Sequence, residues 1–478
     1  MSFSFDVINQ SIYNQEKFEV SQPKLGQDIE VTSEYQQTLA HLRAPTTQIV
    51  FVTGGAGSGK STLIKYIVSQ TDIFGCVPVI APTGIAALNV NGQTIHKFFK
   101  IPVIGDNEIY TSQALITLLE QQHDWSIFNK ISLIIIDEVS MVRCDLLDAI
   151  DHVLKKITRR NELFGGIKVL LVGDLLQLPP ISNHTTEMLL MDRGYRDKYF
   201  FNAKCLRGAI SECVVLTKPF RQTESSFLAL LNNIRFGRDL TTAVSEINRC
   251  YSNNETDIYS LSVTPTRALA DTINLDNFNK LPGEETIFTA KTERDYVIQR
   301  LSNGEPDDTR LPAPFHLKLK DDAIVMFTKN DIDNRWVNGT IGKIRGEEID
   351  GEIKVILVET PLGSGTIYRV NLEKWENCHY EYDQEKDEVK KISTGIYIQY
   401  PLQLAWAVTI HKCQGLTLDN INIEMGTRGA FANGQTYVAL SRCTKIEGIK
   451  LTRPLTVADI KVSQEILKFY REIGAYPQ

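Results

Sequence analysis

The sequence predicts an α/β fold with a doubly wound parallel sheet, and three observations support this prediction. Apolar runs typical of buried strands recur at 49–53, 77–81, 131–136 and 167–172. Helical patterns separate the runs, and polar residues stand where each run ends. Because ligands collect at the carboxyl ends of parallel strands, this alternation is typical of a doubly wound sheet.

Length and composition limit the possibilities further. A chain of 478 residues is too long for one core, so we expect about two to four domains. With 42% hydrophobic and 23% charged residues, it is typical of soluble globular proteins. The net charge of −7 and the pI near 5.7 argue against indiscriminate binding to a polyanion, but they leave room for a local basic groove.

Targeting and redox signals are sparse in this chain. No run of about 18 apolar residues is present, so we expect no membrane span. The N-terminus lacks an apolar signal region, and neither a secretory nor a mitochondrial targeting signal is recognised. Eight cysteines form no C-x-x-C pair, which indicates neither a zinc site nor a disulfide framework and fits a reducing intracellular compartment.

A glycine-rich loop, GGAGSGKS at residues 54–61, follows the first apolar run and precedes a helical pattern. The pattern G-x-x-x-x-G-K-S lets bare backbone N–H groups surround phosphate oxygens at a helix N-terminus. Lys60 adds a cation, and Ser61 adds a hydroxyl for a magnesium-bound triphosphate. The expected nucleotide contacts are Gly55, Ala56, Gly57, Ser58, Gly59, Lys60, Ser61 and Thr62.

The residues ahead of this loop are less informative. Residues 1–30 are polar and weakly patterned, and we expect an N-terminal extension. A short helical pattern then begins near Thr32. Its Gln36 fits either of two roles, because it could read an adenine edge or be a surface glutamine on a capping helix.

Polar and aromatic residues follow the second apolar run. Pro82 and Thr83 suit contacts to a backbone or a phosphate at the sheet edge. Farther on, His96, Phe98 and Phe99 could hold a nucleic-acid backbone and stack its bases. The alternative for Phe98 and Phe99 is an ordinary place in the core.

Two carboxylates and a glutamine end the third and fourth runs. Asp137 suits a magnesium contact, and Glu138 suits a base for an attacking water. Gln177, within GDLLQLPP, can hydrogen-bond a γ-phosphate or its attacking water. These side chains complete the hydrolytic site predicted for the first sheet.

A second α/β pattern begins near residue 211. Its apolar runs at 213–216 and 261–264 lead to polar residues, and the pattern resumes at 402. Short β-rich runs between 315 and 400, separated by Gly, Asn and Asp, predict a small β-barrel inserted into it. Arg442 ends an apolar helical stretch, from which it could reach a γ-phosphate bound by the other domain.

Eight sequence blocks occur in one order between about residue 32 and residue 452. They are GGAGSGKS, APTGIAALNVNGQTIHKFF, IIIDEVSM, FGGIKVLLVGDLLQLPP, FRQ, VTPTR, AWAVTIHKCQG and YVALSR. Through them the chain resembles the Pif-type (petite integration frequency) DNA helicases of helicase superfamily 1, in the branch that also holds RecD. The combination of DEVSM, FGG and GDLLQLPP is specific to that family. The chain departs from it by Cys413, where a serine is common.

The resemblance implies two RecA-like domains with ATP between them. The first is residues 31–212, and the second is residues 213–314 with 401–478. It also implies a wedge element within 84–110 and an SH3-like β-barrel insert at 315–400. The implied cofactors are ATP and Mg²⁺, and the implied activity is 5′-to-3′ movement on single-stranded DNA.

Roles follow from the resemblance residue by residue. The implied catalytic residues are Lys60, Glu138, Gln177 and the two arginine fingers Arg221 and Arg442. Ser61 and Asp137 would contact the metal, and Gly415 would join the nucleotide contacts. The implied DNA-facing and coupling residues are Pro82, Thr83, His96, Thr264, His411, Lys412 and Gln414.

The resulting prediction is an ATP-dependent 5′-to-3′ DNA helicase that unwinds forked or tailed duplexes. G-quadruplexes and RNA–DNA hybrids are further candidate substrates, in replication, recombination, repair or telomere-type maintenance. One rival is a translocase that strips proteins from single strands without opening duplexes. The other is a non-enzymatic nucleic-acid adaptor that binds through the β-barrel. We expect a monomer, in the cytoplasm at the nucleoid if the cell is bacterial.

Overall fold

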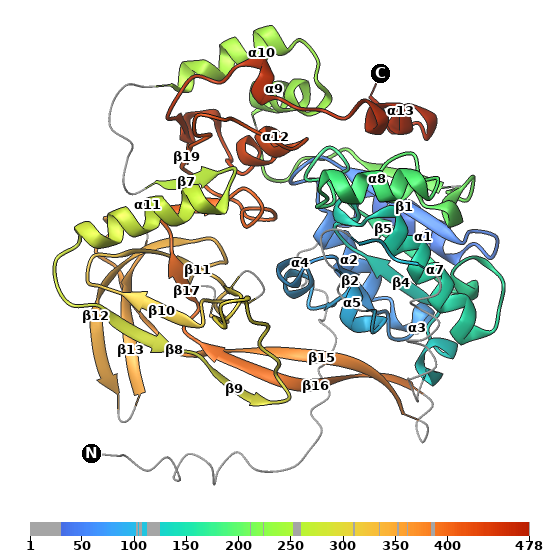
Figure 1. Ribbon diagram of the computed structural model, residues 1–478, viewed down its shortest axis with the longest axis horizontal. Coiled ribbons are helices and arrows are strands. Elements are labelled where there is room, and N and C mark those ends of the chain that lie inside the picture. The colour runs from blue at the N-terminus through green and yellow to red at the C-terminus, as the bar shows by residue number, and fades with distance from the viewer. Residues whose placement is uncertain are drawn as a thin grey trace.

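The structure is a computed structural model that describes residues 30–101, 104, 108–111, 125–210, 212–222, 224–251, 260–308, 311–333, 335–350, 353–360, 362–383 and 388–477. The N-terminal extension predicted for residues 1–30 lies outside these residues except for Glu30, and so does part of the predicted wedge element. Figure 1 shows two helix-covered units and a region of long antiparallel strands. No helix among the described residues is both long and apolar enough to cross a membrane.

The first α/β unit contains a six-stranded parallel sheet in the order β3-β2-β4-β5-β1-β6. Its strands are β1 (Ile49–Gly54), β2 (Val79–Ala81), β3 (Gln93–Thr94), β4 (Leu133–Ile136), β5 (Lys168–Val172) and β6 (Glu212–Leu216). Its helices are α1 (Ser33–Arg43), α2 (Lys60–Val68), α3 (Thr71–Phe74), α4 (Gly84–Asn89), α5 (Ile95–Phe98), α7 (Cys144–Thr158) and α8 (His184–Asp192). The predicted parallel α/β class is confirmed.

Both faces of this sheet are covered by helices. Successive side chains of a strand point to opposite faces, so a strand covered on both sides must be apolar throughout. In β1, Phe51 packs in one core with Leu147 of α7, and Val52 packs in another core with Leu63 of α2. This is the packing of a doubly wound sheet.

The second α/β unit contains a four-stranded parallel sheet in the order β18-β7-β19-β20. Its strands are β7 (Leu261–Thr264), β18 (Ala407–Thr409), β19 (Ile421–Ile423) and β20 (Ile449–Leu451). Its helices are α9 (Ser225–Phe236), α10 (Leu240–Ile247), α11 (Arg267–Lys280) and α12 (Gln435–Leu440). Leu261, Ile421 and Val438 lie in its core.

The position of β6 differs from the predicted division of the chain. The prediction puts residues 213–216 at the start of the second domain. Instead β6 pairs in parallel with β1, with Cys213 opposite Phe51, and forms an edge of the first sheet. An apolar run indicates a strand but not its partner, so this pairing could not be read from the pattern.

Antiparallel strands form the region between and around residues 315 and 400. Five of them, in the order β14-β13-β12-β11-β17, form one sheet: β11 (Ile324–Phe327), β12 (Ile341–Asp350), β13 (Ile353–Glu359), β14 (Ile367–Val370) and β17 (Leu402–Leu404). The other strands are β15 (Glu373–Asp383), β16 (Glu388–Gln399) and β9 (Lys291–Arg294) in one sheet, and β10 (His316–Leu319) with β8 (Thr286–Thr289) in another. The antiparallel insert is therefore present, and its closure into a barrel stays a prediction.

The chain ends on the first unit, although the prediction assigns residues 401–478 to the second domain. Helix α13 (Gln464–Glu472) packs Ile466, Leu467 and Tyr470 into the core of the first unit. Phe469 stacks on Phe201 with ring centroids 4.2 Å apart. Figure 1 shows this helix apart from α12 and close to the first unit. We call residues 463–477 the C-terminal strap.

Candidate active site and adjoining groove

The predicted phosphate-binding loop joins β1 to α2. Gly59 begins α2 with φ of 87°, a left-handed conformation that favours glycine. Lys60 Nζ donates hydrogen bonds to the carbonyl oxygens of Gly54 and Gly55, each at 2.9 Å. Burial lowers the pKa of Lys60, although Asp174 and Glu138 oppose this shift. The Lys60 ammonium group is therefore bound by backbone carbonyl oxygens of its own loop.

The remaining loop residues fit a phosphate and a metal. Ser58 Oγ is buried and has no hydrogen-bond partner among the described residues, so a phosphate oxygen could satisfy it. Ser61 is exposed on the first turn of α2, and Thr62 is half-buried beside it. Within the described chain no cluster of three metal-ligating side chains occurs. Magnesium at Ser61 and Asp137 would therefore rely on phosphate and water oxygens, as this ion commonly does.

The two predicted carboxylates follow β4. Asp137 Oδ1 accepts a hydrogen bond from the backbone N–H of Glu138 at 2.8 Å. Glu138 has φ of 48° and ψ of 44°, a costly conformation for a residue other than glycine and one that clusters at functional sites. Burial, reinforced by the charge of Glu138, raises the pKa of Asp137 to about 7. Burial also raises the pKa of Glu138, which suits a group that accepts a proton.

Gln177 belongs to a buried network that joins the two units. Its Nε2 donates to Asp174 Oδ2 at 3.2 Å. Arg235 of α9 donates to the same carboxylate through Nη2 at 2.8 Å and Nε at 3.2 Å. Although burial opposes ionisation, the charge of Arg235 lowers the pKa of Asp174. Sequence reasoning missed Asp174 and Arg235, because only the folded chain brings them together.

Gln414 lies against the candidate base. Its Nε2 donates to Glu138 Oε2 at 2.9 Å and lies 3.5 Å from Gln177 Oε1. The resemblance assigned Gln414 to DNA contacts and coupling. The structure puts its side chain at the hydrolytic residues of the first unit, although the residue belongs to the second.

The two predicted arginine fingers lie close to each other and bond to their surroundings in the second unit. Arg442 is 1% exposed and donates to Val438 O at 2.8 Å and to Ser441 Oγ at 2.9 Å. Arg221 donates to Ser441 O at 3.0 Å and to Gly415 O at 3.3 Å. Burial, together with the charge of Arg442, lowers the pKa of Arg221 to about 9. In this conformation both guanidiniums are held by backbone oxygens of the second unit.

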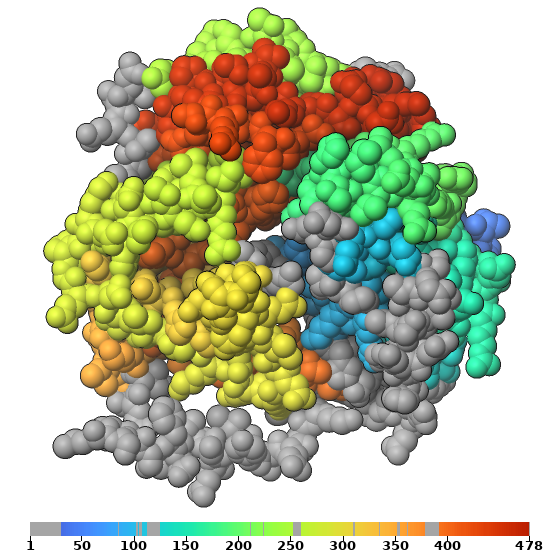
Figure 2. Space-filling model, in the orientation of Figure 1, coloured from blue at the N-terminus to red at the C-terminus, as the bar shows by residue number. Residues whose placement is uncertain are grey.

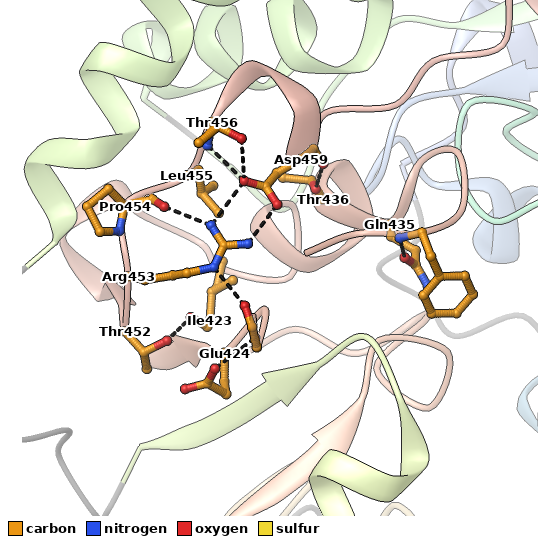
Figure 3. Close-up of polar contacts among 12 residues, drawn as sticks. Ile423, Glu424, Gln435, Thr436, Thr452, Arg453, Pro454, Leu455, Thr456 and Asp459 are labelled. Carbon is orange, nitrogen blue, oxygen red and sulfur yellow. Dashed lines mark hydrogen bonds and ion pairs between the residues drawn. The ribbon is translucent and has the colours of Figure 1, made fainter. Parts of the chain in front are cut away.

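An ion pair fixes the segment that leads into α12, the helix before Arg442. Figure 3 shows Arg453 beside Asp459, and its Nη2 donates to Asp459 Oδ1 at 2.7 Å. Arg453 Nε also donates to Gly426 O at 2.8 Å, and Thr436 Oγ1 donates to the Asp459 carbonyl oxygen. Against the effect of burial, hydrogen bonds from Arg453 and Thr456 lower the pKa of Asp459 to about 2. The start of α12 is therefore held by Asp459, which is itself paired with Arg453.

Tyrosines that sequence reasoning missed contact the phosphate-binding loop. The Ala56 backbone N–H donates to Tyr437 Oη at 2.8 Å, across the two units. Tyr35 Oη donates to Gly59 O at 2.7 Å, while the neighbouring Gln36 is exposed on α1. Tyr437 lies within the block YVALSR, in which the sequence indicated only an apolar helical face.

A groove of about 1650 Å³ runs between the first unit, the second unit and the antiparallel strands. Figure 2 shows the molecule hollowed where these parts meet. Six of the predicted DNA-facing residues line it: Pro82, Thr83, His96, His411, Lys412 and Gln414. Burial lowers the pKa of both His411 and Lys412. The groove therefore adjoins the hydrolytic residues at Gln414.

The other three predicted residues lie outside the groove lining. Phe98 and Phe99 are 7% and 0% exposed and pack edge to face in the core of the first unit, with Phe128 beside them. In this conformation neither ring can stack on a base, and the core alternative describes them. Thr264 is also buried, and its Oγ1 donates to Thr266 O at 3.0 Å.

These features together define a P-loop nucleoside triphosphatase, and its predicted hydrolytic residues lie where the two α/β units meet. The family described as PIF1-like helicase matches residues 29–242. The ATP-dependent DNA helicase Pif1 of Bdellovibrio bacteriovorus is 31% identical over 93% of this chain and 92% of that protein. The mouse ATP-dependent DNA helicase PIF1 is 30% identical over 88% of this chain and 60% of that protein, so the chain spans about 60% of the length of its mammalian relatives.

Solved structures agree with this relationship. The crystal structure of Bacteroides Pif1 with ADP-AlF4 has a TM-score of 0.80 and 32% identity, over 94% of this chain and 100% of that chain. The same protein bound to single-stranded DNA has a TM-score of 0.63 and 32% identity, over 93% and 97%. The chain belongs to the PIF1-like helicase family.

Proposed function

We propose that this chain is an ATP-dependent DNA helicase that moves 5′-to-3′ along single-stranded DNA. The observation that carries the proposal is the position of Gln414. Its amide donates to Glu138 at the hydrolytic site, and the same residue lines the groove. Glu138 itself also lines the groove, so a change there can reach the candidate base directly or through the Gln414 amide.

The proposed reaction uses residues from both units. Magnesium-bound ATP supplies the phosphoryl group and a metal charge that offsets the negative charge of the phosphates. Lys60 and Ser61 bind the phosphates and the metal with Asp137, and Glu138 accepts the proton of the attacking water. Arg442 approaches from the second unit to stabilise the charge that accumulates on the transferred group.

The proposed strand lies in the groove. Thr83 and His96 of the first unit and His411 and Lys412 of the second would contact it on two sides. Closure around ATP and opening after hydrolysis would alter the spacing of these contacts, so that each cycle moves the chain along the strand. The Bacteroides relatives bound to ADP-AlF4 and to single-stranded DNA support both ligands. The direction follows the family resemblance.

The test is strand separation on duplexes that carry a 5′ or a 3′ single-stranded tail, with ATP and Mg²⁺. We expect unwinding of the 5′-tailed duplex only. Glu138→Gln should still bind a non-hydrolysable ATP analogue and the strand but should not unwind. Unwinding of the 3′-tailed duplex alone contradicts the direction. A chain that neither unwinds nor shows DNA-stimulated ATP hydrolysis contradicts the helicase activity itself.

The burial of Phe98 and Phe99 favours a second candidate, a translocase that displaces proteins from single strands. These rings belong to the predicted wedge element at 84–110, and they lie in the core. A protein roadblock on a single strand, compared with a naked fork, separates the two candidates. Displacement of the roadblock without opening of the fork supports the translocase.

We also propose that the two α/β units are RecA-like domains, that the antiparallel strands close into a small SH3-like barrel, and that the chain works as a monomer. In a bacterial cell it would work at the nucleoid. Light scattering during size exclusion, with and without a strand, tests the monomer. A dimeric mass in both conditions contradicts it.

A further inference from the structure

An exposed aromatic ring projects into the groove from the segment before α12. Phe431 is 60% exposed, compared with 45% for Phe220 and 37% for Tyr251. It lines the same groove as Thr83 and Lys412. Ile181, Leu275 and Val297 are also exposed and line this groove. Exposed apolar side chains that share a groove are typical of binding sites, whereas isolated ones are ordinary.

The segment that carries this ring is rigidly held. The backbone N–H groups of Phe431 and Ala432 both donate to Gln435 Oε1, at 2.9 Å and 3.1 Å. Gln435 is itself buried at the start of α12, and Figure 3 shows the next residue, Thr436, beside the Arg453–Asp459 pair. The exposure of Phe431 is therefore part of the folded loop, because the backbone around it has fixed hydrogen-bond partners.

The same segment also touches the first unit. Gly434, with φ of 75°, lies so close to the carbonyl oxygens of Leu176 and Gln177 that an added Cβ would come within 2.5 Å of them. Asn433 Nδ2 donates to Tyr199 Oη of the first unit at 3.1 Å. Ile181, four residues after Gln177 in the chain, also lines the groove and is 73% exposed. Phe431 thus stands where the groove meets the loop that carries the candidate phosphate sensor.

We propose that Phe431 stacks on an unpaired base of a single strand in this groove. The inference deepens the proposed function and rests on it, since it names a base contact in the strand-binding groove. Aromatic rings stack on any base, so such a contact tolerates all sequences and suits a protein that must move along a strand. Thr83 and Lys412, which line the same groove, suit the sugar-phosphate backbone instead.

The experiment compares strands with and without bases. Binding of a deoxythymidine oligonucleotide, and of an abasic strand of the same length, is measured by fluorescence anisotropy for the wild type, Phe431→Ala and Phe431→Trp. A stacked base contributes roughly 1 to 3 kcal/mol, so Phe431→Ala should weaken binding to the base-bearing strand by about 5- to 150-fold. The abasic strand should bind both proteins alike, and Phe431→Trp should retain the wild-type affinity.

Salt dependence and a matched surface variant complete the test. Because stacking releases no counterions, the slope of log affinity against log salt should be the same for Phe431→Ala and the wild type. Ile332→Ala is the control, since Ile332 is 92% exposed outside the groove lining. Equal weakening of Phe431→Ala on both strands, or no weakening on either, overturns the inference. Failure of the wild type to bind any strand overturns the proposed function instead.

Discussion

The two sides of the nucleotide site are held in different ways. On the first unit, Lys60, Asp137 and Glu138 stand at the ends of strands, and their hydrogen bonds lie within their own loops or reach Gln414. On the second unit, Arg442 and Arg221 bond to backbone oxygens of that unit. On the first side only Lys60 must exchange backbone oxygens for phosphate oxygens, because Asp137 and Glu138 already stand at a strand end. On the second side both cations must make this exchange. Under the proposed function, hydrolysis therefore depends on a reorientation of Arg442 and Arg221.

Arg442→Ala should have the largest effect, because it removes the cation that the second side would supply. An arginine finger is worth roughly 10³ to 10⁵ in rate, so DNA-stimulated ATP hydrolysis should fall by at least about a hundredfold. ATP binding, measured by titration calorimetry, should remain close to wild type. Arg442→Lys should recover little, since an ammonium lacks the planar fork of donors. Turnover above a third of wild type would move the role to Arg221.

The Arg235–Asp174 pair tests whether a contact between the two units contributes to the free energy of unfolding. Arg235→Ala leaves a buried carboxylate without its partner, which costs about 3 to 5 kcal/mol. The free energy of unfolding in urea measures this loss. The double variant Arg235→Ala with Asp174→Ala should recover part of it, because no unpaired charge remains. A loss below about 1 kcal/mol, the value of an exposed pair, would contradict a buried junction.

Tyr470→Phe tests whether the C-terminal strap stabilises the first unit near the phosphate-binding loop. The Tyr470 hydroxyl lies 2.8 Å from Thr53 Oγ1 and accepts from the Leu175 N–H at 3.0 Å. Its removal leaves buried groups without a partner, so unfolding should become easier by about 1 to 3 kcal/mol. Tyr476→Phe is the matched control, because Tyr476 is half-buried and bonds to Arg238. An equal or larger loss in the control would contradict the supporting role.

The smallest expected effect is a change in how the free energy of unfolding depends on pH. Asp137 has its pKa raised to about 7 in the folded chain, above the value of about 4 expected when unfolded. The folded state therefore binds the proton more tightly, and stability should fall as pH rises from about 4 to about 7, by less than about 1.4 kcal/mol per pH unit. Asp137→Asn should flatten this slope in urea titrations. An unchanged slope would assign the titration to other groups.

Much of the part of the nucleotide site that lies on the first unit could be predicted from the sequence. The loop at 54–61, the carboxylates at 137 and 138 and Gln177 are short patterns attached to strand ends, and a parallel sheet brings strand ends together whatever the rest of the chain does. The side-chain contacts then follow from local geometry. For the same reason the doubly wound class was predictable.

The junctions between the units could not be predicted in this way. Arg235, Tyr437 and Tyr470 meet the first unit only through tertiary packing, and no periodic pattern distinguishes them from ordinary core or surface residues. The pairing of β6 with β1 was missed because an apolar run does not identify its neighbour. The sequence could not decide whether Phe98 and Phe99 stack on bases or pack in the core, because a pair of aromatic residues has the same pattern in both places.

The C-terminal strap has a mechanical consequence. The chain leaves the first unit after β6 and enters the second at α9, and it returns after Ile460 to end in the first unit at α13. The second unit is thus connected to the first by two chain segments, one before α9 and one after Ile460. A cut in either crossing alone leaves the units connected. The separation that the two units can reach is limited by the shorter of these two connecting segments.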